Sequence, residues 1–279
     1  MSQRRTRRAN KAARPTASVS SYWDRTHWPL QCLYFLLPML VAYQLGAILY
    51  APDDMARVPP ILAESLLRRF FEVFGVTGVY LPGLCVIAVL LGWHVMKRDP
   101  WEPEWRLYVG MLVESLLLVV PLLVLGAVIM RGEIDSVLLS LGQAGVEAGG
   151  GADGGGRVVD GAAGPGGPGV AGLSTPALMV ISIGAGIFEE LLFRLVAIAL
   201  LHGLLVDVLQ LPDRWGMVAA VVCSSLAFAF YHFGENDPLV WAHFALYCLA
   251  GVYLAVVYIV RGFGIVVAVH AIYDVIVFL

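Results

Sequence analysis

The chain has 279 residues, of which 59% are apolar and only 14% are charged. A soluble domain is typically about 45–50% apolar and about 25% charged, so this composition excludes a disordered protein and disfavours an ordinary soluble enzyme. A formal net charge of −3 also argues against a nucleic-acid partner. Because the apolar residues come in long blocks, we expect an all-α, polytopic bundle of transmembrane helices in the lipid bilayer.

The chain begins with a basic arm, residues 1–28, whose first part carries basic side chains and no acidic ones: Arg4, Arg5, Arg7, Arg8, Lys11 and Arg14. The positive-inside rule places such an arm in the cytoplasm. The apolar run that follows is longer than the roughly 7–15 residues of a signal-peptide core, which predicts an uncleaved first helix.

About 20 apolar residues span a bilayer as a helix, and the sequence predicts about seven such helices. They are expected at about 29–50, 78–96, 107–130, 175–201, 215–233, 239–260 and, in a shorter form, 264–279. Between the first two, Leu62, Leu66, Phe70 and Phe74 recur at near-helical spacing with charged residues between them. This pattern predicts an amphipathic helix that lies in the membrane interface.

A Gly-rich tract over residues 142–173 shows no apolar period and is expected to be a flexible linker. It separates a three-helix membrane anchor region, residues 29–141, from a four-helix unit, residues 174–279. Counting Arg261 among the inner loop charges, the loops also favour a cytoplasmic N-terminus. The Ala- and Gly-rich composition is typical of a GC-rich bacterial genome, which predicts a location in the bacterial cytoplasmic (inner) membrane.

The fourth predicted helix contains three ionisable residues, Glu189, Glu190 and Arg194. An ionisable residue inside a spanning helix costs at least about 2.5–3.5 kcal/mol and indicates a functional site. Glu190 and Arg194 are spaced i,i+4 and can pair on one face, whereas Glu189 is offset by about 100° and stays free for chemistry. A purely structural ion-pair cluster is the alternative, but it would not explain Glu189.

Two further helices carry polar pairs at the same i,i+4 spacing. Phe228 and His232 end the fifth helix, and His270 and Asp274 share a face of the seventh. A carboxylate beside an imidazole can orient the ring, although a terminal histidine or a His–Asp pair can also be structural. Together the three helices offer a general base, a second acid–base group and an oriented imidazole.

Weaker candidates lie elsewhere in the chain. Glu114, in the middle of the third helix, is expected to line a cavity or to bond to a neighbour, and His243 in the sixth helix is expected to be a packed or hydrogen-bonding residue. Gly184 and Gly186 precede the glutamates and would allow close helix approach. The sixth helix is therefore the one helix of the four-helix unit that is expected to add no polar group to the site.

The segments EELLFR (189–194), FAFYH (228–232) and HAIYD (270–274) match the motifs EExxxR, FxxxH and Hxxx(N/D). In this order, in successive apolar helices, they resemble the CPBP (or Abi) family of intramembrane proteases, which includes CAAX prenyl proteases and bacteriocin-processing or immunity proteins. The resemblance covers about residues 176–279. It implies an intramembrane endopeptidase that cleaves a membrane-associated protein or peptide.

The resemblance also implies roles for individual residues. Glu189 would activate water with help from His232, while His270 and Asp274 would stabilise the oxyanion of the tetrahedral intermediate. Glu190, Arg194 and Phe228 would support them. Asp274 stands where many family members have Asn. Because an ionised Asp cannot donate to an oxyanion, it is expected to orient His270 or to stay protonated.

Alternatives remain open at this stage. No cofactor is expected, but Glu189, His232 and His270 could instead hold Zn²⁺, since the family has been described both as metalloproteases and as glutamic proteases. Intramembrane Glu, His and Asp residues also serve proton-coupled transporters. A non-catalytic immunity or binding protein could use the same scaffold.

The predicted helix boundaries place two of the proposed catalytic residues at different depths in the membrane. If the helices are straight, Glu189 lies near the middle of the membrane and His232 at the end of its span. At a rise of about 1.5 Å per residue, the mismatch approaches about 20 Å. Either the segment 234–237 dips into a polar cavity or the boundaries differ from those predicted.

Overall fold

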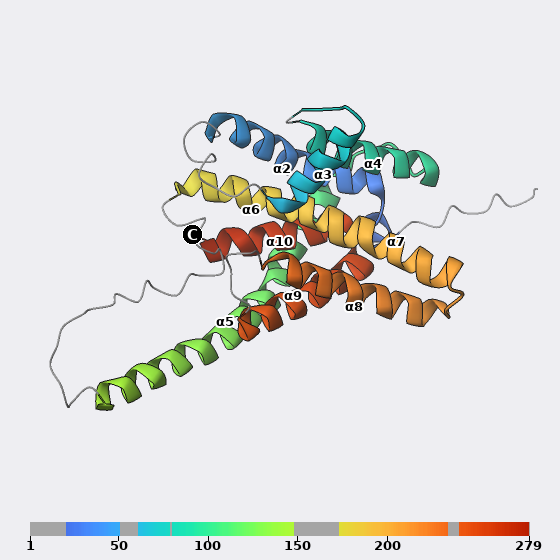
Figure 1. Ribbon diagram of the computed structural model, residues 1–279. Helices are drawn as coiled ribbons and strands as arrows, with labels where there is room; N and C mark the ends of the chain where they lie inside the picture. The colour runs from blue at the N-terminus through green and yellow to red at the C-terminus, as the bar shows by residue number, and fades with distance from the viewer. Residues whose placement is uncertain (1–20, 51–60, 79, 148–172, 234–239, 279) are drawn as a thin grey trace, which may run out of the picture.

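The computed structural model describes residues 21–50, 61–78, 80–147, 173–233 and 240–278, with only the backbone described for 132–147. The regular structure in these residues is entirely helical (Figure 1). An all-α bundle is therefore confirmed. The basic arm up to residue 20, most of the predicted Gly-rich linker and the segment 234–239 lie outside the described residues.

Most of the predicted helices begin and end close to the predicted positions, but the third and the fourth end later than predicted. The third, expected to end at about 130, continues to Glu147, so residues 142–147 of the predicted flexible linker are helical instead. The helices are α1 (Tyr22–Arg25), α2 (Pro29–Tyr50), α3 (Leu62–Val73), α4 (Leu81–Lys97), α5 (Trp105–Glu147), α6 (Thr175–Glu190), α7 (Ile198–Gly203), α8 (Asp213–Tyr231), α9 (Trp241–Arg261) and α10 (Phe263–Phe278). The π-helical segment η1 (Leu191–Ala197) joins α6 to α7, and a second one, η2 (Leu204–Val208), extends α7, so that Thr175–Val208 form one continuous rod. The fourth predicted helix thus ends at Val208 rather than at 201.

Five of the described helical segments are long and apolar enough to cross a membrane. They are Pro29–Tyr50, Trp105–Arg131, Thr175–Val208, Asp213–Tyr231 and Trp241–Arg261. The shorter apolar helices α4 and α10 bring the set to the predicted seven. The protein is therefore an integral membrane protein.

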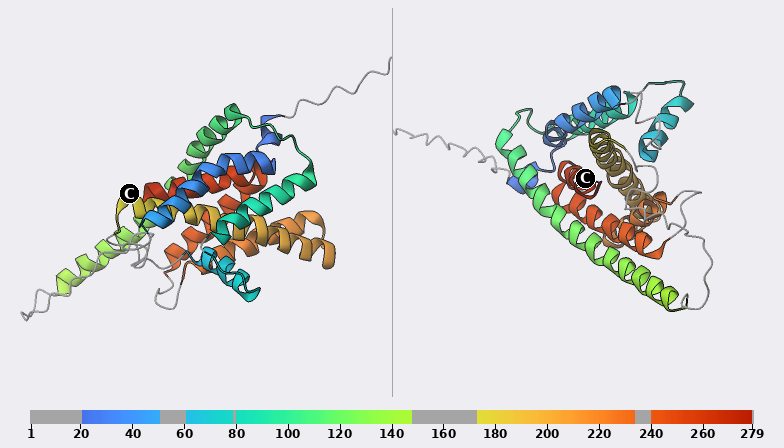
Figure 2. Two further views of the ribbon diagram at one scale, coloured as in Figure 1. Left: turned by 90° about the horizontal axis from the view of Figure 1, so that it is seen from above. Right: turned by 90° about the vertical axis from the view of Figure 1, so that its left-hand side faces the viewer.

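Helix α10 runs through the middle of the bundle and packs against α2, α5, α6 and α9 (Figure 2). All nine residues from Phe263 to Ala271 are buried. A helix that is apolar all round is stable only when other elements enclose it. The short length of α10 is compatible with this central position, because the longer helices around it face the lipid.

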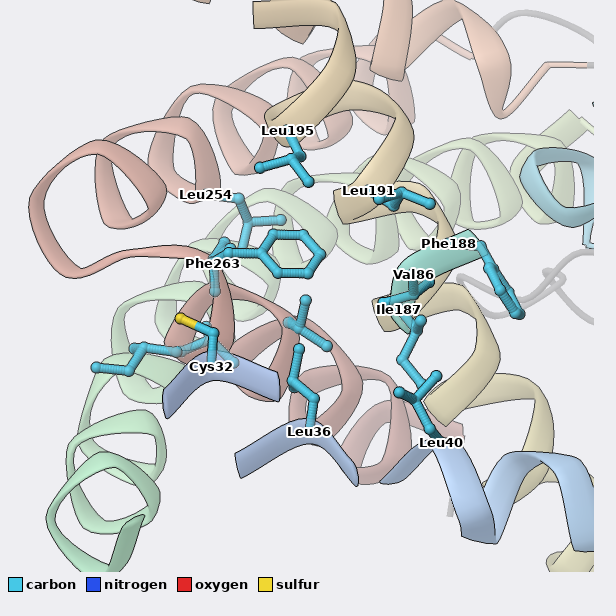
Figure 3. Packing of buried hydrophobic residues seen from close by; sticks show 14 of the residues in the cluster. Cys32, Leu36, Leu40, Val86, Ile187, Phe188, Leu191, Leu195, Leu254 and Phe263 are labelled. Carbon is cyan, nitrogen blue, oxygen red and sulfur yellow. The ribbon is translucent and has the colours of Figure 1, made fainter. Parts of the chain in front are cut away.

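One hydrophobic core connects helices from both sides of residues 148–172. Leu36 of α2, Ile187 of α6 and Leu254 of α9 belong to the same buried cluster (Figure 3). Burial of a Leu or Ile side chain stabilises a fold in water by about 1.5–3 kcal/mol. In lipid, the stabilisation comes from van der Waals contacts between closely packed side chains instead. How well the side chains of these helices pack together therefore determines how the helices are arranged.

The predicted close approach of helices at Gly184 and Gly186 is confirmed. A Cβ atom at Gly186 would lie 2.8 Å from Cβ of Ala271 and 3.0 Å from the carbonyl oxygen of Val267. A Cβ atom at Gly184 would lie 2.4 Å from the ring of Tyr43. The absence of a side chain at Gly186 therefore brings the backbones of α6 and α10 into contact beside the glutamates.

Arg261, which was expected to be a loop charge, lies instead in a largely buried ionic cluster. Arg261 is 4% exposed and donates hydrogen bonds to both carboxylate oxygens of Glu114. The same carboxylate accepts a 2.8 Å hydrogen bond from the hydroxyl of Tyr22, and the guanidinium lies 3.6 Å from the ring centroid of Trp23. Arg261 is thus a buried residue that links α9 to α1 and α5, and it is not a loop charge. Of the two predictions for Glu114, the one that it bonds to a neighbour is confirmed.

Helix α3 is amphipathic, as predicted. Leu66 and Phe70 are exposed, whereas the buried carboxylate of Glu64 accepts hydrogen bonds from Tyr43 and Arg68 at 2.7 and 2.6 Å. Polar contacts therefore fix the inner face of α3, and its outer apolar side chains are available to the membrane interface.

We expect Gly186→Ala to destabilise the protein by about 1–3 kcal/mol, because the added methyl group forces the backbones of α6 and α10 apart. Gly92→Ala in α4 is the matched control, since a Cβ atom there meets no atom within 4 Å. Thermal unfolding of both variants in detergent measures the difference. Equal melting temperatures for the two variants would contradict close packing at Gly186.

Candidate active site

The hairpin formed by the α6–α7 rod and α8 brings Glu189 and His232 to the same depth. Glu189 lies 19 residues before Val208, and His232 lies 19 residues after Asp213. At about 1.5 Å per residue, each is roughly 28 Å from the turn between the two helices. The expected mismatch of about 20 Å is therefore wrong, because the helix that carries Glu189 continues to Val208.

Three helices place one carboxylate between two imidazoles. Oε2 of Glu189 lies 3.9 Å from Nε2 of His232 and 3.9 Å from Nε2 of His270. Glu189 is 7% exposed. Both separations are too long for a direct hydrogen bond and have the length that one bridging water can span.

The short hydrogen bond to His270 comes from Glu190. Nδ1 of His270 lies 2.7 Å from Oε1 of Glu190, whereas Oδ2 of Asp274 lies 3.6 Å from Nε2. Asp274 is expected to orient this ring or to stay protonated, and the closer partner of the ring is Glu190 on α6. The physical reason is the contact at Gly186, one helical turn before Glu190, which brings α6 against α10.

The predicted pair between Glu190 and Arg194 is present. Nε of Arg194 lies 3.1 Å from Oε2 of Glu190, and both side chains are fully buried. Arg194 also donates to the carbonyl oxygen of Gly251 at 3.5 Å, and its guanidinium lies 4.4 Å from the ring centroid of Phe228. Glu190 therefore contacts a cation on one oxygen and the His270 imidazole on the other.

The ring of His232 is oriented by the turn that precedes it. Nδ1 lies 2.8 Å from the carbonyl oxygen of Phe228. A carbonyl can only accept, so Nδ1 carries the hydrogen and Nε2 of the neutral ring is an acceptor that faces Glu189. The Phe228 ring packs edge-on against His232 at 4.6 Å and against His270 at 5.9 Å.

Two features of the site were not predicted. Tyr247 of α9 stacks on the His232 ring at 4.1 Å with an interplanar angle of 17°, and the α9 carbonyl of Gly251 accepts from Arg194. Tyr247 and Gly251 are spaced i,i+4, which puts them on one helix face. That spacing is the signal in the sequence by which they could have been found.

The π-helical segment η1 begins directly after the two glutamates. Within it, the carbonyl oxygen of Phe193 accepts a 2.6 Å hydrogen bond from the hydroxyl of Ser224 on α8. Segments of π-helix recur at functional sites because they change which side chains and carbonyls face a neighbouring helix. Here η1 contains Arg194 and ties this part of the rod to α8.

The donor atoms around Glu189 are of the kind that bind zinc, but they are spaced more widely. Neighbouring ligands of a tetrahedral Zn²⁺ with bonds of about 2.0–2.2 Å lie roughly 3.3–3.6 Å apart, against 3.9 Å for both Glu189–His contacts. In the part of the chain that the structure describes, no group of three or more His, Cys, Asp or Glu side chains is arranged to hold a metal ion.

We expect Arg194→Gln to lower the free energy of unfolding by about 3–5 kcal/mol, because it leaves the fully buried carboxylate of Glu190 without its cation. Arg25→Gln is the control. It breaks the ion pair with Glu104, in which the two side chains are 27% and 39% exposed, and such a pair contributes at most about 1 kcal/mol. Unfolding in detergent compares the two, and similar losses would contradict the importance of the buried pair.

Comparison with known proteins identifies the C-terminal unit. Residues 171–276 match the family described as type II CAAX prenyl endopeptidase Rce1-like, and the match includes Glu189, His232, His270 and Asp274. Searches among curated proteins and among solved structures found no match. This match confirms the resemblance drawn from the three motifs, and it supports a membrane-embedded endopeptidase of the CAAX type for this part of the chain.

Proposed function

We propose that the protein hydrolyses a peptide bond in a membrane-associated protein or peptide, using a water molecule that Glu189 activates. The observation that carries this proposal is the position of the Glu189 carboxylate, 3.9 Å from an imidazole nitrogen on each of two other helices. A buried base and two polarising groups that converge on one point are what hydrolysis of an amide requires.

Glu189 and His232 together can orient the attacking water. The water donates one hydrogen to the carboxylate and the other to Nε2 of His232, so that its lone pairs point toward the scissile carbonyl carbon. As the new C–O bond forms, Glu189 takes the proton, and it passes this proton to the amide nitrogen when the C–N bond breaks. Both steps conserve protons and need no external acid.

His270 is the proposed donor to the oxyanion. With a proton on each nitrogen, it donates from Nδ1 to Glu190 and from Nε2 toward the developing charge. Asp274, 3.6 Å from Nε2, orients the ring when ionised and donates a second hydrogen bond when protonated.

The proposed setting is the bacterial cytoplasmic membrane, with the N-terminus in the cytoplasm. The basic residues before the first helix and the Ala- and Gly-rich composition support this assignment. A substrate that is itself anchored to the bilayer would reach the site by diffusion within the membrane.

Glu189→Gln is expected to lower the cleavage rate by at least about 100-fold, since the amide is nearly isosteric but cannot take a proton. The assay is hydrolysis of an internally quenched, prenylated CAAX peptide by the purified protein in detergent. Glu72→Gln, which changes an exposed carboxylate of α3, is the matched control and should cleave at the wild-type rate. Wild-type turnover by Glu189→Gln would remove the assignment.

Metal content tests the same mechanism independently of activity. We expect elemental analysis of the purified protein to find no stoichiometric zinc, and 1,10-phenanthroline to leave both the melting temperature and the cleavage rate unchanged. One zinc per chain that disappears in His232→Ala and His270→Ala would instead assign these residues to a metal site.

A further inference from the structure

We propose that Tyr247 of α9 is a positioning residue that holds the imidazole plane of His232 so that Nε2 faces Glu189. This inference rests on the proposed function, because it concerns the geometry of the same water-binding pair. It gives α9, which contributes none of the carboxylates or imidazoles that converge on Glu189, a defined part in the reaction.

The contact between the two rings is a parallel stack. Their centroids lie 4.1 Å apart and their planes differ by 17°, whereas Phe228 and Tyr231 approach the same imidazole edge-on, at 4.6 and 5.3 Å. A parallel ring covers one whole face of the imidazole and resists rotation of its plane. An edge-on ring resists such rotation less.

His232 needs this support because of its place in the chain. It is the C-cap of α8, directly after Tyr231, where the helix restrains the backbone on one side only. Its hydrogen bond from Nδ1 to the Phe228 carbonyl fixes one atom of the ring, and the ring can still pivot about that atom. The stack on Tyr247 removes the remaining freedom and thereby sets the direction of Nε2.

Helix α9 is itself held firmly against the site. Gly251 lies one turn after Tyr247, and a Cβ atom there would be 3.1 Å from Cα of Ser225, so α9 and α8 are in backbone contact. The carbonyl of Gly251 also accepts from the buried Arg194. The Tyr247 ring therefore projects from a backbone whose distance from α8 is fixed.

Substitution of Tyr247 separates positioning from simple packing. Tyr247→Leu should lower kcat by about 10- to 100-fold, the cost of a small misplacement of a catalytic group, and leave KM for the quenched prenylated peptide unchanged. Tyr247→Phe keeps the ring and should retain wild-type kcat. Phe244→Leu, one turn earlier on α9 and in contact with Phe230 and Phe233 instead, is the matched control and should also retain it.

Thermal unfolding of each variant is measured alongside, and Tyr247→Met, which is flexible but similar in bulk, replaces the Leu variant if that one does not fold. Wild-type kcat in Tyr247→Leu or in Tyr247→Met would overturn the inference. So would an equal loss in Tyr247→Phe, because that would assign the effect to the hydroxyl group. Glu189→Gln is assayed in parallel, and its full activity would reject the proposed function itself, whatever Tyr247 does.

Discussion

The carboxylate of Glu190 is fully buried, and its charge is stable there only because two partners share it. Arg194 neutralises one oxygen at 3.1 Å, and Nδ1 of His270 contacts the other at 2.7 Å. Removing either partner would leave an uncompensated charge in an apolar bundle, which costs several kcal/mol. This interaction fixes the relative position of the α6–α7 rod and α10, and with it the distance between Glu189 and His270.

Several features of the fold follow from this constraint. The carboxylate can reach α10 only because Gly186 allows the two backbones to touch. Arg194 can remain buried because the Phe228 ring covers it and the carbonyl of Gly251 accepts one of its N–H groups. A fully buried cation that faces a carboxylate, an aromatic ring and a carbonyl is held in place by all three, so we assign Arg194 a structural role.

Contacts within one helix could be predicted from the sequence, and contacts between helices could not. The spacing of Glu190 and Arg194 revealed their ion pair, and the motifs revealed which helices form the site. The hydrogen bond from His270 to Glu190 joins residues 80 positions apart, and nothing in their spacing indicates it. The fourth helix was likewise predicted to end too early, because His202 and Gly203 interrupt the apolar run, whereas the helix continues through them to Val208.

We propose that this membrane bundle cleaves other membrane-associated chains and that Glu189 performs the proton transfer. The most direct measurement is a proteome-wide comparison of the N- and C-termini of membrane proteins in cells that express either the wild-type protein or Glu189→Gln at equal levels. We expect a set of new termini that appears only with the wild-type protein. The same termini in both strains would contradict the proposed role of Glu189.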